Sequence, residues 1–170
     1  MKLFSIIFLS VSILAACSTP ETAVVTEPDS APVEISNIPD WYSNDHFAAS
    51  DSAAVFGFAM ASAADSVRAV EYARQSAVQN LKFEIDRLTE VARLELAESS
   101  SSPYSDTAYI INLRNVIRDL QTDSAEYTFV HDTADSGIHY VFAKAVMSRV
   151  GLIELLESEL SDQALLGKLR

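Results

Sequence analysis

Cysteine, glycine and basic residues are all scarce in this sequence, and each scarcity excludes something. The 170 residues include one cysteine, so no intramolecular disulfide can form. Four glycines are too few for a phosphate-cradling loop. Lys and Arg total 12 against 24 Asp and Glu, which gives a net charge of −12. Such a surface repels phosphate backbones and anionic headgroups, so we expect no nucleic-acid partner, and membrane attachment needs an anchor.

Recognisable catalytic motifs are also absent from the sequence. It contains no Gly-x-Ser-x-Gly, Gly-x-Gly-x-x-Gly or His-Glu-x-x-His pattern. Ser136, His139 and Asp135 could be arranged on paper as a Ser/His/Asp site, but loop composition alone produces such neighbours. We therefore predict that the protein is not an enzyme and has no catalytic, cofactor-binding or metal-binding residues.

Two of the three histidines lie in one predicted hairpin. If that hairpin is symmetric about Asp135, His131 and His139 lie opposite each other on adjacent strands and could begin a zinc site. A third ligand is not evident, because Asp132 would point to the other face. Ordinary surface or half-buried histidines are the preferred interpretation.

The one long apolar run stands at the N-terminus. Lys2 is followed by about 14 apolar or small residues, which is short of the roughly 20 needed to span a bilayer. A basic start, a short apolar run and small residues at its end are typical of a secretory signal peptide. Leu14-Ala15-Ala16-Cys17 resembles the bacterial lipobox, in which the cysteine sulfur receives diacylglycerol and the new N-terminus is acylated. An ordinary signal peptide with an incidental cysteine is the alternative.

This pattern predicts residues 1–16 as a lipoprotein signal peptide and Cys17 as the lipid attachment site. Several acyl chains anchor a protein firmly, at about 0.8 kcal/mol per buried methylene. By the same resemblance, Ser18 after the cysteine favours sorting to the outer membrane. Residues 17–37 are predicted to be a flexible tether, because prolines and polar residues there leave too little apolar surface to fold.

The remaining residues, 38–170, are predicted to form one α+β domain, since 49% of the chain is apolar and 21% charged. Trp41, the only tryptophan, is expected to pack in the core rather than bind a ligand. A first strand is expected over Ala53–Ser62, and Ser62 with Asp65 predicts a capping box. A helix then follows to Glu98, with an apolar residue at every third or fourth position.

A second helix is predicted after a serine-rich loop, with Ser102 as its cap and Pro103 at its first position. It is expected to fold back on the distal half of the first helix, or else to pack between protomers. A β-hairpin turning at 132–137 and a closing helix over Leu152–Leu169 complete the domain. The predicted order is β-α-α-β-β-α, with a small antiparallel three-stranded sheet packed on the long helix.

Five short motifs carry a resemblance. They are Cys17, Pro39-Asp40-Trp41-Tyr42, Phe56-Gly57-Phe58-Ala59, Ala69-x-x-x-Ala73-Arg74-x-x-Ala77-x-x-x-Leu81 and Tyr140-Val141-Phe142-Ala143. Together they resemble the LPP-twenty family of small bacterial lipoproteins, to which an outer-membrane lipoprotein of flagellar assembly is related. The resemblance covers roughly residues 38–150 and implies a dodecin-like or SHS2-like domain with an envelope-structural or assembly role. The family's glycine-rich strand is represented here by Gly57 alone.

The sequence therefore predicts a lipid-anchored protein of the outer membrane, on its periplasmic or surface face. It is expected to act without catalysis, through self-association or by binding envelope proteins, because open sheet edges and an overhanging helix favour oligomers. The alternative is a periplasmic regulator or small-ligand-binding lipoprotein that acts on an envelope enzyme.

Overall fold

The computed structural model describes residues 35–99 and 103–170. The chain divides into two units, Met1–Pro32 and Val33–Arg170, and the fold below is that of the second. The predicted signal peptide, Cys17 and most of the predicted tether lie outside the described residues. Their predicted roles stay predictions.

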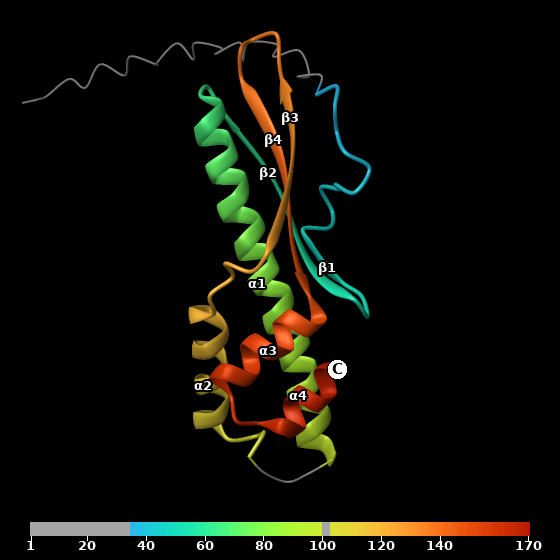
Figure 1. The fold of residues 1–170 in the computed structure, drawn as a ribbon, viewed down its shortest axis with the longest axis vertical. Helices are drawn as coiled ribbons and strands as arrows, with labels where there is room; N and C mark the ends of the chain where they lie inside the picture. The colour runs from blue at the N-terminus through green and yellow to red at the C-terminus, as the bar shows by residue number, and fades with distance from the viewer. Residues whose placement is uncertain (1–34, 100–102) are drawn as a thin grey trace, which may run out of the picture. The chain divides into compact units, whose positions relative to one another are not determined.

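The described part of the chain is an α+β fold, as predicted, with one antiparallel sheet and helices packed on it (Figure 1). The sheet has four strands in the order β1-β2-β4-β3. The elements are β1 (Ala48–Ser50), β2 (Ala54–Ala63), α1 (Ser66–Ser99), α2 (Thr107–Asp119), β3 (Glu126–Thr133), β4 (His139–Ser148), α3 (Arg149–Glu159) and α4 (Gln163–Leu169).

Two features of the predicted order were wrong. The sheet has a fourth strand, because Ala48 pairs with Gly57 and Ser50 with Val55 at the edge of β2. The predicted closing helix is divided into α3 and α4. Asp162 causes the division, since its carboxylate accepts the backbone N–H groups of Ala164 and Leu165 at 3.1 and 3.0 Å and starts a new helix.

Both predicted caps were also misplaced. The long helix begins at Ser66, and the Asp65 carboxylate accepts the Arg68 N–H at 2.9 Å, while β2 continues through Ser62 to Ala63. The second helix begins later than Pro103, after Asp106, whose carboxylate accepts from Ala108 N. Ser102 is outside the described residues. In each case an aspartate supplies the cap in place of the predicted serine.

α1 lies close against one face of the sheet because small residues meet there. On β2, every second residue from Val55 to Ala59 points to the helix and is buried. The helix presents its own small side chains to them, and a Cβ on Gly57 would lie 2.9 Å from Leu81 Cα and nearer still to the Ala77 carbonyl oxygen. Glycine at position 57 is therefore a packing requirement, not only a strand irregularity.

The other face of the sheet is covered by residues 35–47, which we call the strap (Figure 1). The Trp41 ring stacks on Phe58 with centroids 5.9 Å apart, and Tyr42 meets Phe142 edge-on at 4.8 Å. Both strap aromatics are half-buried. The prediction that Trp41 lies in the core was wrong: its half-buried ring packs on the sheet face that α1 leaves open.

The distal half of α1 extends beyond the sheet and is covered by the other helices (Figure 1). α2 runs antiparallel to it: Lys82 Nζ donates to the Arg118 carbonyl at 3.0 Å, and farther along, Arg93 donates to the Tyr104 carbonyl. From α4, Lys168 reaches Glu95 at 3.0 Å. The predicted antiparallel pair is confirmed. The overhang is thereby covered in part within one chain, although Val91 and Leu94 of α1 stay exposed. The open edges of the sheet are a further structural reason for self-association.

Candidate functional site

The predicted opposition of His131 and His139 was wrong. The strands pair with Thr133 opposite His139 and His131 opposite Val141. The turn is therefore centred one residue later than assumed, with Gly137 in the left-handed conformation at φ 79°. Across residues 35–99 and 103–170, no group of three His, Cys, Asp or Glu side chains is placed to hold a metal ion.

The Ser/His/Asp arrangement considered above is not assembled either. Asp135 and Ser136 are exposed turn residues, and His139 Nδ1 lies 3.1 Å from Thr133 Oγ1. Within the described residues, no hydrogen bond joins His139 to Ser136 or Asp135. A nucleophile without a base in hydrogen-bond reach is not activated in this geometry.

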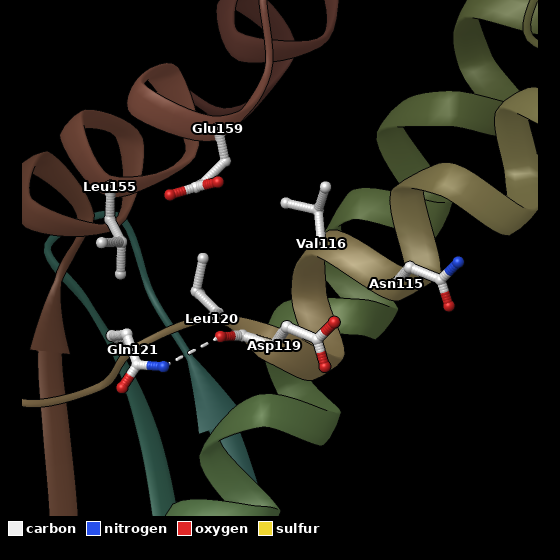
Figure 2. A pocket seen from close by; sticks show the side chains of 7 residues that line it. All are labelled: Asn115, Val116, Asp119, Leu120, Gln121, Leu155 and Glu159. Carbon is white, nitrogen blue, oxygen red and sulfur yellow. Dashed lines mark hydrogen bonds between the residues drawn. The ribbon is translucent and has the colours of Figure 1, made fainter.

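An open groove of about 330 Å³ lies between α2 and α3 (Figure 2). Its floor is formed by leucine and valine side chains, and polar side chains stand around it. Gln121 Nε2 donates to the Asp119 carbonyl at 3.3 Å, and the Asp119 carboxylate is bound by Arg118. Glu159 points into the groove from α3 (Figure 2). Of its two carboxylates, that of Asp119 is already paired, and the two do not belong to any group of three metal-ligating side chains among the described residues.

The strap is fastened at two places on the sheet. The first is an aromatic contact. The Lys144 ammonium lies 5.3 Å from the centroid of the Trp41 ring, and the same ring stacks on Phe58. Such a cation–π contact at a partly exposed site contributes about 0.5–1 kcal/mol. Because this contact lies on the sheet face opposite α1, the strap covers that second face of the sheet.

The second fastening is Asp132, near the end of β3. Its carboxylate accepts the backbone N–H groups of Ser36 and Asn37 at 2.7 and 3.1 Å, and Asn37 Nδ2 donates to the His131 carbonyl at 3.3 Å. The Asn37 N–H, with the Ser36 and Thr133 N–H groups, holds the pKa of Asp132 below its usual value. Ser36 and Asn37, at the end of the predicted tether, are thus tied to the edge of the sheet.

Replacing Asp132 with alanine is expected to release the start of the strap without unfolding the domain. The Ser36 and Asn37 amides lose their acceptor, so their hydrogen exchange should accelerate while amides of β4 stay protected. Because the pKa of Asp132 is lowered, the fastening is complete above the ordinary value of 3.8 and is lost only as the pH falls below it. The matched control is Asp135→Ala in the exposed turn. Equal exchange in the two variants would contradict this role.

A partly buried polar cluster ties α1, α2 and α4 together. Tyr104 and Tyr109 donate their hydroxyl protons to the Asp162 carboxylate at 3.2 and 2.7 Å. Burial and the bond to Asp162 raise the pKa of Tyr109. Arg93, with its side chain 7% exposed, binds Glu90 at 2.7 Å and the Tyr104 carbonyl. No sequence motif indicated this cluster, and every buried side-chain polar atom of the described residues has a partner. Its role is to hold the helices in place.

Comparison with protein-family models, curated proteins and solved structures found no match to this chain. The resemblance to the LPP-twenty family therefore stays a prediction from the motifs. Within residues 35–99 and 103–170, no helix combines the length and apolar character that a membrane crossing requires.

Proposed function

We propose that this protein is a lipid-anchored component of the cell envelope, held at the outer membrane through Cys17, with a non-catalytic structural or assembly role. It acts by self-association or by binding envelope proteins. The observation that carries the proposal is Leu14-Ala15-Ala16-Cys17 after a short apolar run, with the only cysteine of the chain at the position that lipid attachment requires.

The fold supports a binding role through an open edge of its sheet. β3 is an eight-residue edge strand, and the strap contacts this edge only near its end, at His131 and Asp132. An edge strand of this length offers backbone donors and acceptors to another chain.

Replacing Cys17 with serine is expected to move the protein from the membrane to the soluble fraction. Serine keeps the size of the side chain but removes the thiol that lipid attachment needs, and the net charge of −12 gives no electrostatic hold on anionic lipid. The measurement is membrane fractionation and Triton X-114 partitioning of both forms. Ser18→Ala, one residue away, is the control and should stay in the membrane. Retention of the Cys17→Ser protein in the membrane would contradict the proposal.

Crosslinking in cells, followed by mass spectrometry, separates the proposed role from the alternative. An assembly component should recover mainly itself and neighbouring envelope proteins, in a pattern that Cys17→Ser disrupts. Recovery of a single envelope enzyme in fixed ratio would instead favour a regulator. Light scattering of the detergent-solubilised chain gives the oligomeric state independently.

A further inference from the structure

A groove of about 410 Å³ lies between α1 and α2, on the flank of the long helix. Its apolar floor is formed by Phe83 and Ile117. Phe83 is 52% exposed and meets Phe47, itself 50% exposed, with ring centroids 5.3 Å apart. Two large aromatic side chains left half-exposed in contact with each other are a suitable anchor for an apolar side chain of a partner.

Most charged side chains around this floor are basic, although the chain as a whole is acidic. Lys82, Arg114 and Arg118 line the groove, with Asp86 as the one acidic residue among the lining. Asp119 adjoins it and is paired with Arg118. Three cations therefore face two carboxylates here, whereas the chain as a whole has two acidic residues for each basic one.

Two of these cations form no ion pair with a carboxylate of the described residues. Lys82 Nζ donates to the Arg118 carbonyl at 3.0 Å, and Arg114 makes no hydrogen bond or ion pair among those residues. Arg118 is bound to Asp119 in a largely exposed pair, which solvent weakens. Arg118 and, at longer range, Lys82 lower the pKa of Asp119, just as Arg93 and, at longer range, Arg114 lower the pKa of Glu90. Lys82 and Arg114 make no direct pair with these carboxylates, so an incoming carboxylate can still pair with them.

We propose that this groove binds an acidic segment of a partner protein, with an apolar side chain on the Phe47–Phe83 pair and carboxylates on Arg114 and Lys82. The inference rests on the proposed protein-binding role and names the chemistry of the partner. A volume of this size admits one or two side chains, not a membrane surface or a duplex.

A second groove provides an internal comparison. It is lined by Leu88, Val91, Arg149, Lys168 and Arg170, among others, with a volume of about 230 Å³. There Lys168 is paired with Glu95 at 3.0 Å, and no aromatic ring forms its floor. If charge alone determined binding, the two grooves would bind an acidic segment alike. We expect the groove with the aromatic floor to be preferred.

The test uses the full chain, purified in a non-ionic detergent, and a dye-labelled peptide Glu-Glu-Leu-Phe-Glu-Glu, with Gln-Gln-Leu-Phe-Gln-Gln as the uncharged control. Fluorescence anisotropy at low salt should show the acidic peptide binding more tightly than the control. Arg114→Glu should weaken binding about tenfold through charge reversal. Arg170→Glu makes the same charge change in the second groove and should have less than about a twofold effect. Phe83→Ala should also weaken binding, because it removes the apolar contact.

Circular dichroism spectra of the three variants should match that of the wild type, since the replaced side chains are exposed. Equal binding of both peptides, no binding of either, or equal losses for Arg114→Glu and Arg170→Glu would overturn the proposal. The lipid on Cys17 takes no part in this assay. A negative result would therefore exclude the groove as a binding site without affecting the proposed lipid anchor.

Discussion

Gly57→Ala is expected to abolish cooperative folding or to lower Tm by about 10 °C or more. The new methyl group would lie 2.9 Å from Leu81 Cα and closer still to Leu81 N and the Ala77 carbonyl oxygen. These are backbone atoms of α1, so no side-chain rotation relieves the overlap, and the helix must move away from β2. Overpacking usually costs about 1–3 kcal/mol, and this site belongs at or above the top of that range.

Gly167→Ala is the matched control for this substitution. A Cβ at Gly167 meets nothing within 4 Å, and the residue lies in α4. Alanine is the better helix former, so this change should leave stability unaltered or raise it by up to about 1 kcal/mol. Thermal unfolding followed by circular dichroism measures both variants. A Gly57→Ala protein as stable as Gly167→Ala would show that α1 does not lie this close to the sheet.

Arg93→Met is expected to lower the free energy of unfolding by about 3 kcal/mol. Methionine preserves much of the buried stem of the side chain, but the Glu90 carboxylate and the Tyr104 carbonyl lose their donor. Removing one partner of a buried pair typically costs about 3–5 kcal/mol, and the lower end applies because the Glu90 side chain is 32% exposed. Urea unfolding of the detergent-solubilised chain measures the change.

Arg118→Met provides the control for an exposed ion pair. The Arg118 and Asp119 side chains are 70% and 68% exposed, so solvent replaces the lost interaction and the urea midpoint should hardly move. Arg93→Met should affect the helical end of the fold more than the sheet. Arg93 binds the Tyr104 carbonyl just before α2, so amides of α2 should lose more protection from hydrogen exchange than amides of the sheet. Equal midpoints for the two variants would mean that Arg93 does not stabilise the helical end.

The elements with strong periodicity were predictable from the sequence. The apolar stripe that was taken to run from Val67 to Ala92 predicted α1, although Val67 is 72% exposed and Ala69 is buried instead. Two β-rich runs with turn residues between them predicted the β3–β4 hairpin. β1 was missed because Ala48–Ser50 has little strand preference of its own. It is a strand because it pairs with β2.

Two errors had signals in the sequence that were misread. Leu152, Leu156 and Leu160 follow helical spacing, but Leu165 comes five residues after Leu160, and Ser161-Asp162 between them is a helix-start pattern. The centre of the hairpin was placed at Asp135, one residue too early, which displaced the predicted partner of His139 by two residues. Assigning the left-handed turn position to Gly137 would have indicated the observed pairing, with Thr133 opposite His139.

The contacts of the strap and the grooves could not have been predicted in this way. Ser36 and Asp132 are 96 residues apart, and no local pattern brings them together. The same holds for Tyr109 and Asp162, which meet only because α2 and α4 pack on the same helix. Tertiary packing, rather than local preference, decides where such polar groups find partners.

The central claim is a lipid on Cys17, and the intact mass of the protein purified from membranes tests it most directly. The account predicts a chain that begins at Cys17, with residues 1–16 removed and the mass of a diacylglycerol and an N-terminal acyl group added. Base hydrolysis should release the ester-linked chains and leave the amide-linked one. A mature chain with an unmodified Cys17 thiol, or one cut at another residue, would contradict the account.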